Sequence, residues 1–201
     1  MARKIHLPQP EVPRRRRAEL SLVSGEQHYT DVILRLAKAE VAVWIATANL
    51  KDLRVEAPVG TRARASGRFL SILETLDDLR VKGVDVRILH AAVPSRPFLA
   101  ELRRHKSLGD RNQWLRCCPR VHLKAVIIDG AALYLGSANL TGAGMGARAP
   151  DRRNFELGIL TEDSYLLDSV QALFDSIWSG KPCAGCGMKK ICPKPISGIR
   201  C

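Results

Sequence analysis

Two short segments rich in β-branched residues, Val41–Ala46 and Val84–Leu89, flank a stretch with helical periodicity. Such segments are typical of buried strands. Between them, apolar residues recur at helical spacing from Phe69 to Leu79, and Gly83 stands where a helix C-terminal cap belongs. The order strand, helix, strand predicts a βαβ unit, so the sheet should contain parallel strands.

Further elements are expected on both sides of this unit. Ser24–Gln27 fits a capping box before a helix with Tyr29, Val32, Ile33 and Leu36 on one face. Asp129-Gly130 predicts a tight turn between two strands. The later elements are a short helix over 97–105, strands over 121–129, 131–136 and 154–160, and a helix over 164–178. The Gly- and Ala-rich stretch 142–153 predicts a mobile loop, and the fold class is α/β.

The length of 201 residues suits one domain with short appendages, and 46% hydrophobic residues exclude a mainly disordered chain. We expect a basic N-terminal arm over 1–20, a folded domain over 21–180 and a Cys-rich tail over 181–201. No apolar run approaches the ~20 residues of a membrane-spanning helix. Residues 1–8 lack the apolar core of a secretory signal. The expected location is therefore the cytoplasm.

The charge adds the first hint of a partner. Thirty-two Lys and Arg against twenty Asp and Glu give a net charge of +12. A field of this sign attracts polyanions, which include nucleic acid and anionic membrane surfaces. Charge alone identifies no activity.

Candidate chemistry is concentrated after residue 121. His122, Lys124 and Asp129 stand in the order H-x-K-x-x-x-x-D, and Gly136-Ser137-Ala138-Asn139 follows. In a strand, His122 and Lys124 point to the same face. A neutral imidazole is an available nucleophile, and the ammonium group can neutralise phosphate oxygens. Ser137 and Asn139 can add neutral donors, and Glu156 can orient the imidazole.

These residues resemble the signature of the phospholipase D superfamily. The resemblance covers roughly residues 24–179 and includes Asn154–Leu160. It implies an α/β/α sandwich on a mixed, largely parallel sheet. It also implies that His122 is the nucleophile or acid, that Lys124 and Asn139 bind phosphate, and that Glu156 supports His122. Asp129 would be mainly structural, helping to fix the active-site loops, and Ser137 is a weaker candidate.

The chain departs from the two-motif pattern of most phospholipases in that superfamily. Among five histidines, only His122 is followed by Lys two residues later. The mechanism needs two imidazoles, one to attack phosphorus and one to protonate the leaving oxygen. A two-fold dimer supplies both. We therefore expect a homodimer with one composite site, resembling the single-motif, nuclease-like branch of the superfamily.

The tail carries four cysteines: Cys183, Cys186, Cys192 and Cys201. Without a secretory signal, clustered cysteines favour metal binding over a disulfide framework. Four thiolates suit one tetrahedral zinc ion, and an iron–sulfur cluster is the main alternative. We expect a small knuckle held by structural zinc, separate from the chemistry at His122, which uses no catalytic metal. Cys117 and Cys118 are expected to be a buried pair in a strand.

Three functions remain open. The leading hypothesis is a phosphodiesterase, an endonuclease acting on DNA or RNA through a phosphohistidine intermediate. A lipid phosphodiesterase of the phospholipase type would use the same groups, but no amphipathic helix with a Trp, Phe and Leu face is visible. A catalytically silent nucleic-acid-binding subunit is the third possibility.

Overall fold

The computed structural model describes residues 17–105, 108–188 and 192. Most of the expected basic arm and Cys201 lie outside these residues. The first half contains β1 (Ser21–Ser24), a π-helical turn η1 (His28–Ile33), α1 (Leu34–Leu36), β2 (Ala42–Thr47), β3 (Arg54–Glu56), α2 (Arg62–Ala65), β4 (Phe69–Ser71), α3 (Ile72–Val81) and β5 (Asp85–His90). The second half contains α4 (Arg96–Arg104), η3 (Arg111–Gln113), β6 (Leu115–Cys117), β7 (Ala125–Ile128), β8 (Ala132–Gly136), η4 (Pro150–Arg152), β9 (Leu157–Thr161), α5 (Ser164–Trp178) and η5 (Lys181–Cys183).

A seven-stranded mixed sheet with the order β1-β9-β8-β7-β2-β5-β6 forms the centre of the molecule. Only the β2–β5 and β5–β6 pairs are parallel, whereas the other four pairs are antiparallel. The expectation of a largely parallel sheet was therefore wrong. Parallel neighbours need a long crossover, which the chain provides only through α3 and α4. Of the later strands, β7 and β8 are joined by the tight turn at Asp129 and Gly130, whereas the longer segment 137–156 leads from β8 back to its neighbour β9 in the antiparallel direction.

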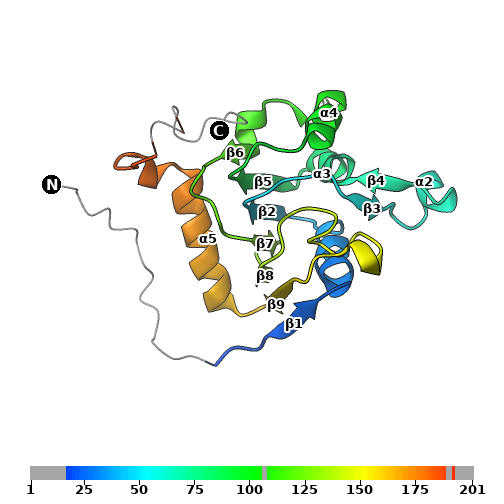
Figure 1. The fold of residues 1–201 in the computed structure, drawn as a ribbon, viewed down its shortest axis with the longest axis horizontal. Helices are drawn as coiled ribbons and strands as arrows, with labels where there is room; N and C mark the ends of the chain where they lie inside the picture. Colours follow the sequence, from blue (N-terminus) through cyan, green and yellow to red (C-terminus); the bar gives the residue numbers. More distant parts are fainter. Residues whose placement is uncertain (1–16, 106–107, 189–191, 193–201) are drawn as a thin grey trace.

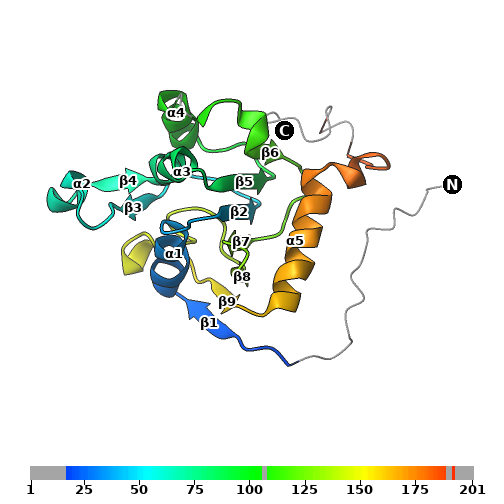
Figure 2. The ribbon, with the colours of Figure 1, turned by 180° about the vertical axis from the view of Figure 1, so that it is seen from behind.

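Helices cover both faces of the sheet, as expected for an α/β/α sandwich. Figures 1 and 2 show α5 alone on one side, with α1, α3 and α4 on the other. The strand residues alternate between two cores. In β7, Val126 and Ile128 join the core beneath α1 and α3, whereas Ala125 and Ile127 join the α5 core with Leu167, Phe174 and Trp178. A separate two-stranded sheet, β3–β4, projects with α2 beyond the α3 side (Figure 1).

Several boundaries differ from those expected. The helix expected from Phe69 begins at Ile72, because Ser71 accepts a hydrogen bond from Glu74 N as its N-cap and Phe69–Ser71 pairs with β3. The strand expected over 121–129 is shorter, since only Ala125–Ile128 joins the ladder.

The stretch 142–153, which was expected to be a mobile loop, has one residue anchored in the core. Met145 is buried at 1% exposure in the core beneath α1 and α3, and its backbone N–H bonds to Thr141 O. No helix within the described residues is both long and apolar enough to span a membrane.

Candidate active site

The connection before β7 presents His122 and Lys124 together. Both residues precede the hydrogen-bonded ladder, yet the alternation of the strand continues through them. Val121 and Leu123 pack in the α5 core like Ala125 and Ile127, so His122 and Lys124 belong to the opposite side. Lys124 Nζ lies 3.2 Å from each ring nitrogen of His122 and donates to His122 O at 2.9 Å. The imidazole is exposed and is accompanied by a cation.

Asn139 is fixed by its side-chain oxygen. Oδ1 accepts a hydrogen bond from Asn49 N at 2.9 Å. Thr47 Oγ1 lies 3.3 Å from the same oxygen and donates its single proton to the nearer Asn49 O at 2.7 Å. A backbone N–H must find an acceptor, so the contact with Asn49 N assigns the orientation of the amide. The amide Nδ2 of Asn139 is therefore available as a donor. Thr47 is fully buried at the end of β2 and also accepts from Leu140 N at 2.9 Å.

Thr47 and Asn49 were missed by the sequence analysis. The one feature of the sequence that could have pointed to them is their position, because Thr47 ends a buried strand and Asn49 follows two residues later. Polar groups at strand ends are candidates for supporting a site, but nothing in the sequence paired them with Asn139.

Glu156 is held by neighbours other than the one expected. It accepts a short hydrogen bond from Ser137 Oγ, and its Oε1 accepts from Asn154 Nδ2 at 3.1 Å. Ser137 Oγ in turn accepts from Leu157 N at 3.1 Å. Among the described side chains, no hydrogen bond joins Glu156 to His122. The structure therefore places Glu156 in a Ser137–Glu156–Asn154 network, and its support of His122 stays a prediction.

The glycine of the Gly136-Ser137 step is required by packing. A Cβ at Gly136 would come within 2.3 Å of Tyr134 Oη and 2.8 Å of the Gly158 backbone. Tyr134 itself is buried at 1% exposure, with the ring of His28 edge-on at 5.5 Å. Because Gly136 has no side chain, β8 and β9 can pair closely next to the buried Tyr134 ring. Ser137 and Glu156 lie directly beside this pair, at the end of β8 and the start of β9.

Asp129 lies at the far end of β7 from His122. An extended chain of this length spans on the order of 20 Å. Asp129 Oδ1 accepts from Val41 N at 2.7 Å and Ala42 N at 2.9 Å, and Glu40 N donates to the same carboxylate. Its backbone has φ of 55°, a left-handed conformation that Asp tolerates. The carboxylate of Asp129 thus binds the start of β2 and not the loops around His122, and its expected structural role stays a prediction.

Burial opposes ionisation of Asp129, yet the hydrogen bonds from Ala42, Val41 and Glu40 outweigh it. They hold the pKa of this carboxyl below its usual value. Asp129 therefore remains a carboxylate that is occupied by backbone donors.

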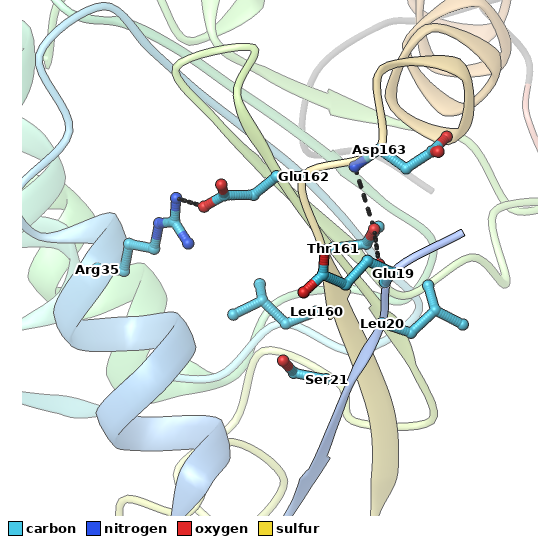
Figure 3. A pocket seen from close by; sticks show the side chains of 8 residues that line it. All are labelled: Glu19, Leu20, Ser21, Arg35, Leu160, Thr161, Glu162 and Asp163. Atoms are coloured by element: carbon cyan, nitrogen blue, oxygen red, sulfur yellow. Dashed lines mark hydrogen bonds and ion pairs between the residues drawn. The ribbon is translucent and has the colours of Figure 1, made fainter. Parts of the chain in front are cut away.

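A hollow at the edge of the sheet, formed by β1 and β9, lies away from the candidate site residues. It has a volume of about 430 Å³, and Glu19, Glu162 and Asp163 line it (Figure 3). Arg35, the basic side chain among the described residues that line it, is paired with Glu162 at 2.6 Å. Three carboxylates and a neutralised cation do not favour an anionic substrate there.

The expected metal tail is only partly described. Among residues 17–105, 108–188 and 192, no three His, Cys, Asp or Glu side chains form a preassembled metal site. Cys183, Cys186 and Cys192 are described, whereas the fourth expected ligand, Cys201, is not. The structural zinc therefore stays a prediction.

Comparison with known proteins places the chain in a family. The family model described as "Cardiolipin synthase, PLD-like domain" matches residues 32–178. A search of the curated proteins finds no match.

Solved structures share the fold. NucT from Helicobacter pylori aligns with a TM-score of 0.53 at 15% identity, over 81% of this chain and 97% of its own. Nuc from Salmonella typhimurium, a phospholipase D family member, gives 0.53 at 17% identity, over 81% and 95%. Phosphatidylserine synthase from Haemophilus influenzae gives 0.54 at 15% identity, over 79% of this chain and 36% of its own. The family match covers more than half of the sequence and includes His122, Lys124 and Asn139, so this chain belongs to the PLD-like domain family and has its phosphodiesterase fold.

Proposed function

We propose that this chain hydrolyses phosphodiester bonds in nucleic acid through a phosphohistidine at His122. The observation that carries the proposal is the exposed imidazole with Lys124 Nζ 3.2 Å from both ring nitrogens. A nucleophile beside a fixed positive charge suits a phosphate substrate. The net charge of +12 favours a polyanion, and the likeness to Nuc and NucT supports a single-motif nuclease.

The proposed reaction has two displacements at phosphorus. A ring nitrogen of His122 forms a bond to phosphorus while the bond to one ester oxygen breaks, and a second imidazole gives that oxygen its proton. Water then attacks the phosphohistidine, the second imidazole takes a proton from the water, and His122 is released. Lys124 and the amide Nδ2 of Asn139 stabilise the charge on the non-bridging oxygens throughout.

The described histidines support a composite site in a homodimer. His28 and His90 are fully buried, and His105 is held between Asp77 at 3.0 Å and Glu101 at 3.2 Å. None of these three can serve as the second imidazole without rearrangement. His122 of the partner subunit would meet the requirement in a two-fold dimer.

A lipid phosphodiesterase is the second candidate, because the matching family description names cardiolipin synthase. The aromatic residues of α5 do not favour it. Phe174 and Trp178 are buried against the sheet, so this apolar face is not available to a membrane surface. Nucleic acid therefore remains the preferred substrate class.

The test offers one enzyme preparation several substrates. Single- and double-stranded DNA and RNA, a supercoiled plasmid and phosphatidylglycerol vesicles are incubated with the wild-type chain and with His122→Ala. We expect nucleic acid cleavage by the wild type and none by the variant, whose fold should persist because the His122 side chain is exposed. Release of lipid headgroups alone would support the lipid hypothesis. Equal cleavage by both proteins, or no turnover of any substrate, would contradict the proposal.

A further inference from the structure

Cys118 lies on the surface against which the cysteine tail packs. It follows β6 and comes four residues before His122, far from the tail in sequence. Yet Cys118, Cys183 and Cys186 line one hollow of about 190 Å³, together with Leu173 and Ile177 of α5. In the ribbons of Figures 1 and 2, the segment that follows α5 and the β6–β7 connection both run beside the C-terminal end of α5.

The first two tail cysteines sit on one tight turn. Cys183 ends η5, and Cys186 N donates to Cys183 O at 3.2 Å. Arg120, from the connection that carries Cys118, donates from Nη1 to Cys186 Sγ at 3.8 Å. This contact joins the connection that carries Cys118 to the tail turn.

Cys117 differs in its oxidation state from Cys118 and the described tail cysteines. Cys118, Cys183, Cys186 and Cys192 all carry thiols. Cys117 differs from them because it is disulfide-bonded. It is also buried in β6, whereas Cys118 lies beyond the strand and is half-buried. The two adjacent cysteines are therefore not the buried pair that was expected.

The tail gains little from burial of its own side chains. Within residues 181–188, every side chain is exposed or half-buried. A segment of this kind lacks the apolar contacts that normally hold a chain in place. A metal bound by its thiolates would supply that stabilisation.

Cys192 belongs to the same group of side chains. Cys118, Cys186, Cys192 and Arg120 all lie close enough to Cys183 to interact with it electrostatically. The backbone N–H of Cys192 also donates to Met188 O at 2.9 Å, just beyond the tail turn.

We propose that Cys118, Cys183, Cys186 and Cys192 bind one zinc ion and so fasten the tail to the segment that carries His122. This assignment replaces Cys201 of the sequence-based expectation with Cys118. Because the described thiols are not preassembled, the tail turn closes onto Cys118 when the metal binds, as in sites whose ligands assemble around zinc. The ion takes no part in the reaction at His122. By binding Cys118, it restrains the segment 119–121 that leads to His122.

The test compares two serine variants of the full chain. Wild type, Cys118→Ser and Cys201→Ser are purified identically, and zinc and iron are measured by mass spectrometry. We expect about one zinc per chain in the wild type and in Cys201→Ser, and loss of zinc from Cys118→Ser. Full zinc in Cys118→Ser, loss of zinc from Cys201→Ser, or iron in place of zinc would overturn the proposal.

A second measurement needs no variant, so a folding defect in Cys118→Ser cannot confuse the result. The wild-type protein is alkylated with iodoacetamide before and after prolonged treatment with a zinc chelator, and the modified cysteines are mapped. We expect Cys118 to be protected together with Cys183, Cys186 and Cys192, and all four to become reactive together. Alkylation of Cys118 at the same rate with and without the chelator would contradict its role as a ligand.

Discussion

The two polar ends of the Asn139 amide have different partners. Its oxygen accepts from Asn49 N, which leaves the nitrogen as the group that can face a phosphate. Replacement by Asp keeps the acceptor but puts negative charge where the donor was. We expect Asn139→Asp to lower turnover by on the order of a hundredfold or more, with the melting temperature nearly unchanged. Initial rates and thermal unfolding are measured on the same sample.

Asn139→Ala serves as the matched control. It removes the anchoring oxygen as well, so Asn49 N loses its acceptor and the melting temperature should fall. If Asn139→Asp cleaves at the wild-type rate, the amide nitrogen does not contact the reacting phosphate.

Lys124 contributes charge at the reacting centre. We expect Lys124→Ala to reduce kcat by about a hundredfold or more, because the lost ammonium stabilises the charge of the transition state. Lys38→Ala is the control, since Lys38 is exposed just after α1 and near Glu40, at the end of the sheet where Asp129 lies. Steady-state kinetics separate the effects. A change in KM alone would mean that Lys124 only attracts substrate.

Asp129 connects two elements, the end of β7 and the start of β2. Asn, like Asp, tolerates the left-handed backbone conformation at this position, where φ is 55°. The substitution therefore keeps the backbone and one side-chain acceptor oxygen but removes the negative charge. We expect Asp129→Asn to lower the free energy of unfolding by about 1–2 kcal/mol at neutral pH. Activity per folded molecule should stay unchanged, because Asp129 lies away from His122.

The pH dependence of this loss has a definite sign. The pKa of Asp129 is lowered in the folded state, so its stabilising effect is present above the unfolded value and disappears as the pH falls through the folded value. The difference in stability between the wild type and Asp129→Asn should therefore begin to shrink below about pH 4 and continue to fall towards the lower folded pKa. Urea unfolding from pH 3 to pH 7 measures this. A difference that stays constant over the range would show that the carboxylate charge does not contribute.

The elements differed in how well the sequence predicted them. Helix α5 and the β7–β8 turn carry strong local signals, namely an apolar stripe and Asp129-Gly130, and the structure confirms both. The strand β1 carries little such signal, since Val23 alone of its residues is buried, and it exists because β9 offers a partner. Strand direction depends on which strands become neighbours, and this information is not local.

The same distinction applies to the site. The spacing of His122 and Lys124 is local, so the side they share could be predicted and the structure places them together. The hydrogen-bond partners of Glu156 depend on how β8 and β9 pair. The sequence alone predicted His122 as its partner, whereas the structure shows Ser137 and Asn154. Cys118 is the clearest case, because 65 residues separate it in sequence from Cys183 beside it in the fold.

The whole molecule is expected to cleave its substrate without a catalytic divalent metal. A two-metal nuclease needs several carboxylates that converge on hard cations. Glu156 is occupied by Ser137 and Asn154, and Asp129 is bound to the backbone at the other end of β7. Lys124, together with Lys124 of the partner subunit in the proposed dimer, would repel a cation and can neutralise phosphate directly.

Activity in excess EDTA should therefore equal activity without it, provided that the exposure is too short to remove zinc from the tail. Acid quenching during turnover should trap phosphate on His122, and light scattering should report a dimer for the active species. The matched control is the same assay with prolonged chelation, in which any loss of activity should follow the slow release of zinc and be reversed by zinc. Immediate inactivation by EDTA that magnesium or manganese reverses, and zinc does not, would show that a hard cation takes part in the chemistry and that His122 is not the nucleophile proposed.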